Sequence, residues 1–244
     1  MEMGNYMEDM EQKRQLESLE QLEASEAAAL EPQLMDVPGM GEVLVGGDPF
    51  GVADQLDDNQ GDNVLNAQGD CGLVSVANIL TLAGMDVTED EVVVAAVGTG
   101  LCHYSTELDP EQNGGTNAQL RQALLQKFGI PCTVLGDGYN GKKPDLDTIA
   151  EYVEAGHGVN LGVNAGYAWN EPSAVMDGRN NHSIIVTGTV RDPESGELKG
   201  LVVCDSGLVG TQSNARVMSV ATLNNAYVNV NGASCLVTDQ PIRA

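Results

Sequence analysis

Basic residues are scarce in this sequence. Lys and Arg number 11 against 36 Asp and Glu in 244 residues, for a formal net charge of -25. Proteins that bind nucleic acid or an anionic membrane surface need Lys and Arg to neutralise phosphates, so both partners are disfavoured. The deficit is local, because residues 15–120 hold 20 acidic residues and no Lys or Arg. This acidity has three readings that stay open: a solubilising face, a surface for a basic partner, or cation binding.

Long apolar runs are also missing. No stretch of about 18 apolar residues occurs, so no membrane span is expected. The N-terminal residues are acidic and lack the apolar region of a standard signal peptide. We therefore expect a cytoplasmic protein, or one exported by a route that uses no cleaved N-terminal signal peptide.

Paired cysteines are absent as well. The five cysteines are odd in number and scattered, with no C-x-x-C pair, at Cys71, Cys102, Cys132, Cys204 and Cys235. This spacing argues against a zinc ribbon and against a disulfide framework. The acidic run 57–63 lacks the ligand spacing of an EF-hand loop and is interpreted as a turn. We expect no metal and no organic cofactor.

The chain divides into three parts. Residues 1–35 are an acidic extension in which positions 6–31, free of Gly and Pro, predict a helix. Residues 36–62 are a Gly- and Asp-rich loop segment with one strand candidate, Glu42–Val45. Residues 63–244 form the globular domain. Its early part predicts helices and its later part paired strands, an α+β order. Helices are expected from 71 to 83, from residue 88, and over 118–128, 145–154 and 221–227; strands are expected over 132–135, 159–164, 183–190, 198–204 and 233–238.

A cysteine stands at the start of the first globular helix. In the run Gln68-Gly69-Asp70-Cys71-Gly72, Asp70 is a helix N-cap candidate and Cys71 the first helical residue. The positive end of the helix dipole favours a thiolate there, which is the form that attacks carbonyls. Backbone N–H groups at the same helix start can hold an oxyanion, and a nearby Gln side chain can add a donor.

A histidine and an aspartate follow on two later strands. His182 opens the strand expected over 183–190, and Asp205 ends the strand expected over 198–204. If the two strands pair as a hairpin, the start of one lies beside the end of the other. Asp205 can then orient the imidazole of His182, which can serve Cys71 as general base and acid.

Each of these residues also has a structural interpretation. Cys71 can be a small core residue, His182 a loop histidine and Asp205 a turn residue. A second thiol–imidazole pair, Cys102 and His103, lacks a helix start and a following Asp. The sole Trp, at 169, lines the substrate cleft or belongs to a small apolar patch.

The Cys-Gly, His and Asp positions resemble the papain-like cysteine peptidases. The resemblance covers roughly residues 60–240, and within that superfamily it is nearest to the double-glycine leader peptidases of bacteriocin exporters and related bacterial enzymes. It implies an α+β papain-like fold, with a helical part carrying the nucleophile Cys71 and an antiparallel sheet carrying His182 and Asp205. It also implies substrate contacts at Gly72, Trp169 and Asn181.

Two departures from that family stand out. The oxyanion Gln of papain-like enzymes usually lies about six residues before the Cys, whereas Gln68 lies three and Gln60 eleven residues before Cys71. Gln68 is slightly favoured, with Gln60 and Asn66 as alternatives. No transporter segment is present in this sequence.

The resemblance predicts a cysteine peptidase that hydrolyses a peptide or isopeptide bond through a thioester. Its partner would be a peptide or protein substrate, and a basic substrate is one candidate. The protein would act as a bacterial effector, a toxin or a leader-processing enzyme. One alternative is a catalytically silent papain-like module that binds a basic or leader-like peptide. Another is a deamidase, transamidase or peptidoglycan amidase. Because double-glycine peptidases cut after such a pair, cleavage after Gly47 of the run Gly46-Gly47 is a further hypothesis. The oligomeric state stays open.

Overall fold

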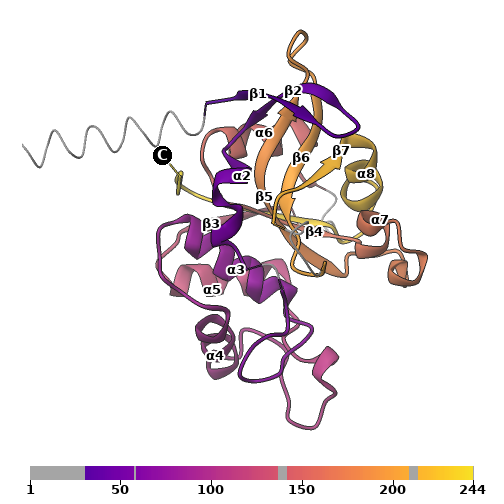
Figure 1. Cartoon of the computed structure of the whole chain (residues 1–244). Helices are drawn as coiled ribbons and strands as arrows, with labels where there is room; N and C mark the ends of the chain where they lie inside the picture. Colours follow the sequence, from indigo (N-terminus) through magenta and orange to yellow (C-terminus); the bar gives the residue numbers. More distant parts are fainter. Residues whose placement is uncertain (1–30, 58, 137–141, 209–213, 244) are drawn as a thin grey trace, which may run out of the picture.

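The computed structural model of the chain describes four stretches, residues 31–57, 59–136, 142–208 and 214–243. The helix expected over residues 6–31 of the N-terminal extension lies outside the described residues, except for residue 31. The prediction of a mixed domain of helices and antiparallel strands is confirmed (Figure 1). The order differs from the expected one, because among these residues two strands precede the first helix and three helices lie among the later strands.

One antiparallel sheet of eight strands runs through the described residues. Its members are β1 (Gln33–Val37), β2 (Gly41–Gly46), β3 (Cys132–Gly136), β4 (Val159–Val163), β5 (His182–Arg191), β6 (Leu198–Cys204), β7 (Arg216–Ser219) and β8 (Ser234–Thr238). β5 is central. One of its edges pairs with β6, while the other pairs with β4 along its first half and with β2 along its second. β8 and β3 extend the sheet beyond β4, β7 extends it beyond β6, and β1 extends it beyond β2.

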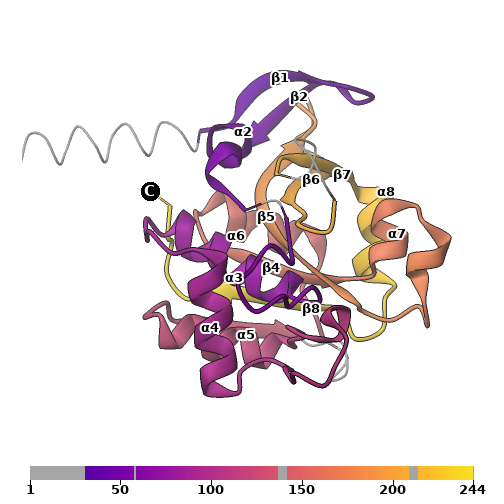
Figure 2. The same cartoon turned by 60° about the horizontal axis from the view of Figure 1, so that its bottom comes forward.

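The helices follow local signals in the sequence. Thr88 and Glu91 form a capping box at the start of α4, and Asn117 accepts a hydrogen bond from Leu120 N at the start of α5. The helices are α2 (Pro49–Val52), α3 (Cys71–Leu82), α4 (Glu89–Thr99), α5 (Ala118–Lys127), α6 (Leu146–Glu154), α7 (Ala165–Trp169) and α8 (Val220–Leu223). Figure 2 shows α3, α4 and α5 gathered on one side of the molecule.

Both faces of the central strand are covered. Ile184 and Val186 of β5 pack in a core cluster with residues of α6, whereas Ile185 packs in a second cluster with residues of α3. Successive side chains of a strand point to opposite faces, so α3 and α6 lie on opposite faces of the sheet. The near-continuous apolar run of β5 is explained by this two-sided burial.

Two expectations need correction. Residues 36–62 are not mainly loop, because the strand expected at 42–45 belongs to a β1–β2 hairpin that pairs with β5. The helix expected over 221–227 is α8 followed by a π-helical turn, Asn224–Val228. β1 and β7 carry no clear sequence signal, because each is short and exists through pairing with a longer neighbour.

The two glycines at 46 and 47 are buried within this sheet. Gly46 pairs with Thr189, and the Gly47 carbonyl accepts a hydrogen bond from Arg243. A peptidase needs its scissile bond exposed and extended, so cleavage after Gly47 requires this part of the sheet to open first.

We expect the packing of α3 on β5 to carry much of the folding stability. Ile185 is 1% exposed, so Ile185→Ala leaves a cavity and should lower the free energy of unfolding by about 2–5 kcal/mol, measured by urea denaturation. Val94→Ala on α4, where the side chain is 50% exposed, is the control and should cost well under half as much. Equal losses would contradict the assignment of Ile185 to the core.

Candidate active site

Cys71 is the first residue of α3, as the sequence predicts. The helix starts there because the Asp70 carbonyl accepts hydrogen bonds from Leu73 N and Val74 N. The Cys71 side chain is half-buried. Gly72 leaves no room for a larger residue, since a Cβ there would collide with Thr116 Oγ1. That packing gives Gly72 a structural role beside the thiol.

His182 and Asp205 meet across the β5–β6 hairpin. The strands pair with Ile185 opposite Cys204, so one step further Asp205 falls opposite Ile184. His182 lies two residues before Ile184 and therefore on the same face of the sheet. His182 Nε2 lies 2.7 Å from Asp205 Oδ1, and the two side chains are only 4% and 0% exposed. A charged hydrogen bond this short and this buried orients the imidazole ring.

The other side of the imidazole faces Cys71. Because Nε2 is engaged by Asp205, Nδ1 is the nitrogen available to the Cys71 thiol, whose pKa His182 lowers. Burial would lower the pKa of His182, but the hydrogen bonds and charges of Asp205 and Cys71 outweigh it and raise the pKa to about 10. Burial would raise the pKa of Cys71, but His182, with a smaller contribution from Arg121, holds it below the usual value. The pair therefore favours thiolate and imidazolium.

The remaining thiols lack this setting. Burial raises the pKa of Cys102, of Cys132 to about 11 and of Cys235 to about 12. His103, the proposed partner of Cys102, is exposed and forms an isolated strand bridge with Gly115. The geometry favours Cys71 over Cys102 as the reactive thiol.

Asp205 is held by groups that the sequence did not reveal. Its Oδ2 accepts a hydrogen bond from Trp169 Nε1 at 2.8 Å and pairs with Arg216 Nη1 at 3.3 Å. Gly207 N donates to Oδ1 at 3.2 Å. Burial would raise the pKa of Asp205, but His182, Trp169 and Arg216 keep it below the usual value. Arg216 lies on β7, which had no strand signal, so sequence reasoning could not find it.

Trp169 and Asn181 are engaged within the protein rather than free for a ligand. The Trp169 ring lies edge-on to the His182 ring, with 5.1 Å between centroids, while its N–H binds Asp205. Asn181 Oδ1 accepts from Ala165 N, and its Nδ2 donates to the Ala174 carbonyl. Trp169 thus supports the imidazole and carboxylate, and Asn181 fixes the turn that carries α7.

Both glutamine candidates line one groove near the start of α3. The groove encloses about 440 Å³ and is lined by Asn59, Gln60, Gly61, Asp62, Gln68 and Glu111. Gln60 Nε2 donates to the Gln68 carbonyl at 2.9 Å, and Gln60 N donates to the Ser206 carbonyl at 3.1 Å. Gln68 is exposed and its amide bonds Asn66 Oδ1 at 3.3 Å. Gln60 therefore lies against the segment that follows Asp205, and Gln68 points to solvent.

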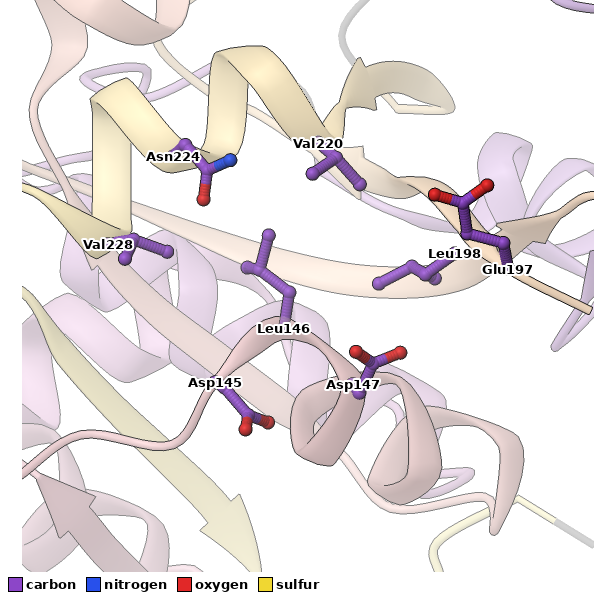
Figure 3. A pocket seen from close by; sticks show the side chains of 8 residues that line it. All are labelled: Asp145, Leu146, Asp147, Glu197, Leu198, Val220, Asn224 and Val228. Atoms are coloured by element: carbon purple, nitrogen blue, oxygen red, sulfur yellow. The ribbon is translucent and has the colours of Figure 1, made fainter.

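A larger hollow lies on the other face of the sheet. It encloses about 490 Å³ between α6 and the α8 turn, where Leu146 points into it and Val220, Asn224 and Val228 line the facing wall (Figure 3). Its lining contains no Cys and no His. The hollow therefore brings no nucleophile and no imidazole to a ligand.

The described residues offer neither a metal-ion cluster nor a membrane-spanning helix. In the part of the chain that the structure describes, no group of three or more His, Cys, Asp or Glu is placed to hold a metal ion. Among the same residues, no helix combines the length and apolarity that crossing a bilayer requires.

Comparisons with known proteins add the following. No known family profile matches the chain. Uncharacterized proteins of Mycobacterium bovis and Mycobacterium tuberculosis are 25% identical over 143 residues, which is 52% of this chain and 61% of theirs. The chain thus matches less than two thirds of the length of these curated relatives.

One solved structure is also similar. It is a double glycine motif protease from an AMS/PCAT transporter in complex with the leader peptide. The similarity has a TM-score of 0.39 and 13% sequence identity, and it covers 70% of this chain and 84% of the other.

Beside Cys71, Asp70 forms an unexpected carboxyl pair. It stands at the N-cap position but makes no capping hydrogen bond, because its side chain turns to Asn63 and hydrogen-bonds Glu89. Asn63 Nδ2 lies 3.1 Å from Asp70 Oδ2 and 2.9 Å from Glu89 Oε1. Two carboxyl groups can share a hydrogen bond only if one keeps its proton. Burial, then the Glu89 hydrogen bond, raises the pKa of Asp70 to about 9.

This carboxyl pair should make folding weaker at alkaline pH. The unfolded chain releases the Asp70 proton above about pH 4, whereas the folded protein keeps it, so stability falls as pH rises toward 9. In Asp70→Asn the side-chain amide can still donate a hydrogen bond, but it has no proton that titrates in this pH range. The unfolding free energy of this variant should fall less than that of the wild type between pH 5.5 and 8.5, by up to about 1.4 kcal/mol per pH unit. Exposed Glu107→Gln is the matched control. A parallel decline in Asp70→Asn and wild type would refute the shared proton.

Proposed function

We propose that this protein is a cysteine peptidase that hydrolyses a peptide or isopeptide bond through a thioester intermediate. One observation carries the proposal: His182 hydrogen-bonds the buried Asp205 at 2.7 Å and lies beside the Cys71 thiol at the start of α3, where it lowers the pKa of that thiol. Nucleophile, base and orienting carboxylate in contact are the requirements of acyl transfer.

Acylation begins with Cys71 as thiolate and His182 as imidazolium. The sulfur attacks the carbonyl carbon and forms a C–S bond, and the carbonyl π electrons move to oxygen. When the intermediate collapses, the C–N bond breaks and His182 Nδ1 gives its proton to the leaving amine. Asp205 holds the ring in place during this transfer. The products of the step are a thioester on Cys71 and a free amine.

Deacylation reverses these roles. His182 takes a proton from water, the resulting hydroxide oxygen attacks the thioester carbonyl, and the C–S bond breaks to give a carboxylic acid. The imidazolium and thiolate pair is then restored. In both steps the charge on the carbonyl oxygen is stabilised by the backbone N–H of Cys71, which lacks an intrahelical acceptor at the first helical position, together with a glutamine amide.

The groove beside α3 favours a basic peptide as substrate. It is lined by Asp62 and Glu111, and no Lys or Arg occurs between residues 15 and 120. Acidic walls attract a cationic chain and repel an anionic one. The acidic composition, which excludes nucleic acid, thereby acquires a functional role in this proposal.

Thiol reactivity is the first test of the proposal. We expect iodoacetamide to label Cys71 rapidly at pH 6, where an ordinary thiol with a pKa of about 8.5 is almost inert. His182→Ala should slow this labelling strongly, and peptide mass spectrometry reads each cysteine separately. His157→Ala is the matched control, since His157 bonds the Thr238 carbonyl and lies outside the site. Labelling of Cys71 that follows an ordinary thiol titration in the wild type would refute the peptidase and favour a silent binding module.

Hydrolysis is the second test. Basic and leader-like peptides are incubated with the wild type and with Cys71→Ala, and products are read by mass spectrometry. We expect cleavage by the wild type and none by Cys71→Ala, while Asp205→Asn should lower kcat by about 10⁴-fold because the imidazole loses its orienting charge. A glutamine-to-glutamate or amine-exchange product in place of a cut would reassign the same chemistry to a deamidase or transamidase.

A matched pair of variants decides which glutamine stabilises the oxyanion. We expect Gln60→Ala to lower kcat by about 10²–10³-fold with little change in KM, because a lost oxyanion donor weakens the transition state. Gln68→Ala should keep near wild-type kcat, since its amide faces solvent. The reverse order of losses would return the role to Gln68.

A further inference from the structure

Arg121 is a buried cation on an otherwise apolar helix face. It belongs to α5, where Ala118, Leu124 and Leu125 are also buried, and it is 4% exposed. Leu124 and Leu125 lie three and four positions later and therefore share its face. Burying a guanidinium is costly unless an anion or a full set of hydrogen bonds compensates it. A buried Arg121 side chain is therefore expected to have an anion or a full set of hydrogen-bond acceptors beside it.

The contacts of Arg121 do not include a carboxylate. Nη1 donates to Thr116 Oγ1 at 3.2 Å, Nη2 donates to Ser234 Oγ at 3.3 Å, and Nε is buried without a hydrogen-bond partner. None of the ion pairs among the described residues includes Arg121. Two neutral hydroxyl groups leave its positive charge unbalanced.

The guanidinium lies directly behind the start of α3. A Cβ at position 72 would be 3.1 Å from Arg121 Cδ and 3.2 Å from Nη1. Gly72 follows Cys71, so its missing side chain lets the cation approach the thiol segment from the side of α5. Burial lowers the pKa of Arg121 to about 10, which leaves it charged at neutral pH.

Asp205 already pairs with two cations, His182 and Arg216. The thiolate of Cys71 is then the anion available to Arg121. The neighbouring Asp70 keeps its proton near neutral pH and adds no charge itself, so the one negative charge of the Asp70–Glu89 pair lies on Glu89. Arg121 from α5 and His182 from β5 thus act on the thiol from different elements.

We propose that Arg121 is a positioning residue that stabilises the Cys71 thiolate independently of His182. The inference rests on the proposed function for the role of the thiolate as nucleophile. When His182 transfers its proton to the leaving amine, it loses its charge, whereas Arg121 keeps its own. A permanent cation therefore favours the thiolate again when the thioester breaks, because it stabilises sulfur as a leaving group.

The test measures the pH dependence of Cys71 alkylation in the full-length protein. Wild type is compared with Arg121→Gln, Arg121→Met and Arg121→Lys, each also in a His182→Ala background. Methionine is included because its aliphatic chain fills the same space if glutamine prevents folding. Arg243→Gln, which removes a half-buried guanidinium that donates to the carbonyls of Gly47 and Thr187, is the control. Circular dichroism checks the fold of each variant.

Loss of the charge should raise the alkylation midpoint. We expect an upward shift of about one pH unit in Arg121→Gln and Arg121→Met, which is about tenfold slower labelling at pH 6. Arg121→Lys and Arg243→Gln should keep the wild-type midpoint. In the His182→Ala background the midpoint should stay below that of an ordinary thiol and reach it only when Arg121 is also neutral.

Two outcomes would overturn the inference. One is a folded Arg121→Gln or Arg121→Met with an unchanged midpoint. The other is Arg121→Lys shifting as far as the neutral variants, since shape rather than charge would then matter. Both leave the low wild-type midpoint and its dependence on His182 in place, so they are distinct from failure of the peptidase proposal, in which the wild type itself titrates as an ordinary thiol.

Discussion

The antiparallel pairing of β5 with β6 determines where the candidate catalytic groups meet. Its register places Asp205 opposite Ile184, on the face of the sheet that also carries His182, and His182 Nε2 lies 2.7 Å from Asp205 Oδ1. A slip of one residue would turn His182 to the opposite face of the sheet. Such a slip is prevented because both faces of β5 are buried, one against α3 and the other against α6. The core packing and the site geometry therefore depend on the same register.

Burial makes the site depend on all of its charges together. A histidine, an aspartate and an arginine with almost no solvent exposure would each be costly alone. Asp205 offsets the charges of His182 and Arg216, and in our proposal the thiolate offsets Arg121. Trp169 and Arg216 add hydrogen bonds to Asp205 and hold its second oxygen. Low exposure strengthens each of these interactions, because water does not screen them.

Residues that look like ligand contacts in the sequence are part of this support. Trp169 and Asn181 were expected to contact the substrate, but their polar atoms form hydrogen bonds within the protein. Gly72 leaves space for Arg121 and Thr116 rather than for a ligand. In our proposal the substrate binds instead in the acidic groove that Gln60 and Gln68 line.

Most of the fold and the three central residues could be predicted from the sequence, because their signals are local. Apolar periodicity, capping residues and glycines after helices depend on neighbours a few positions away, and they predicted α3 to α6, the strands β3 to β6 and β8, and Cys71, His182 and Asp205 as candidates. Only the tertiary structure revealed β1 and β7, the pairing of Asp70 with Glu89, and the places of Gln60, Arg216 and Arg121. Apart from β1, which pairs with the adjacent β2, these depend on contacts between separate segments of the chain, such as Arg121 and Ser234, which are 113 positions apart. A buried charge has no periodic pattern, and its partner is defined only once the chain has folded around it.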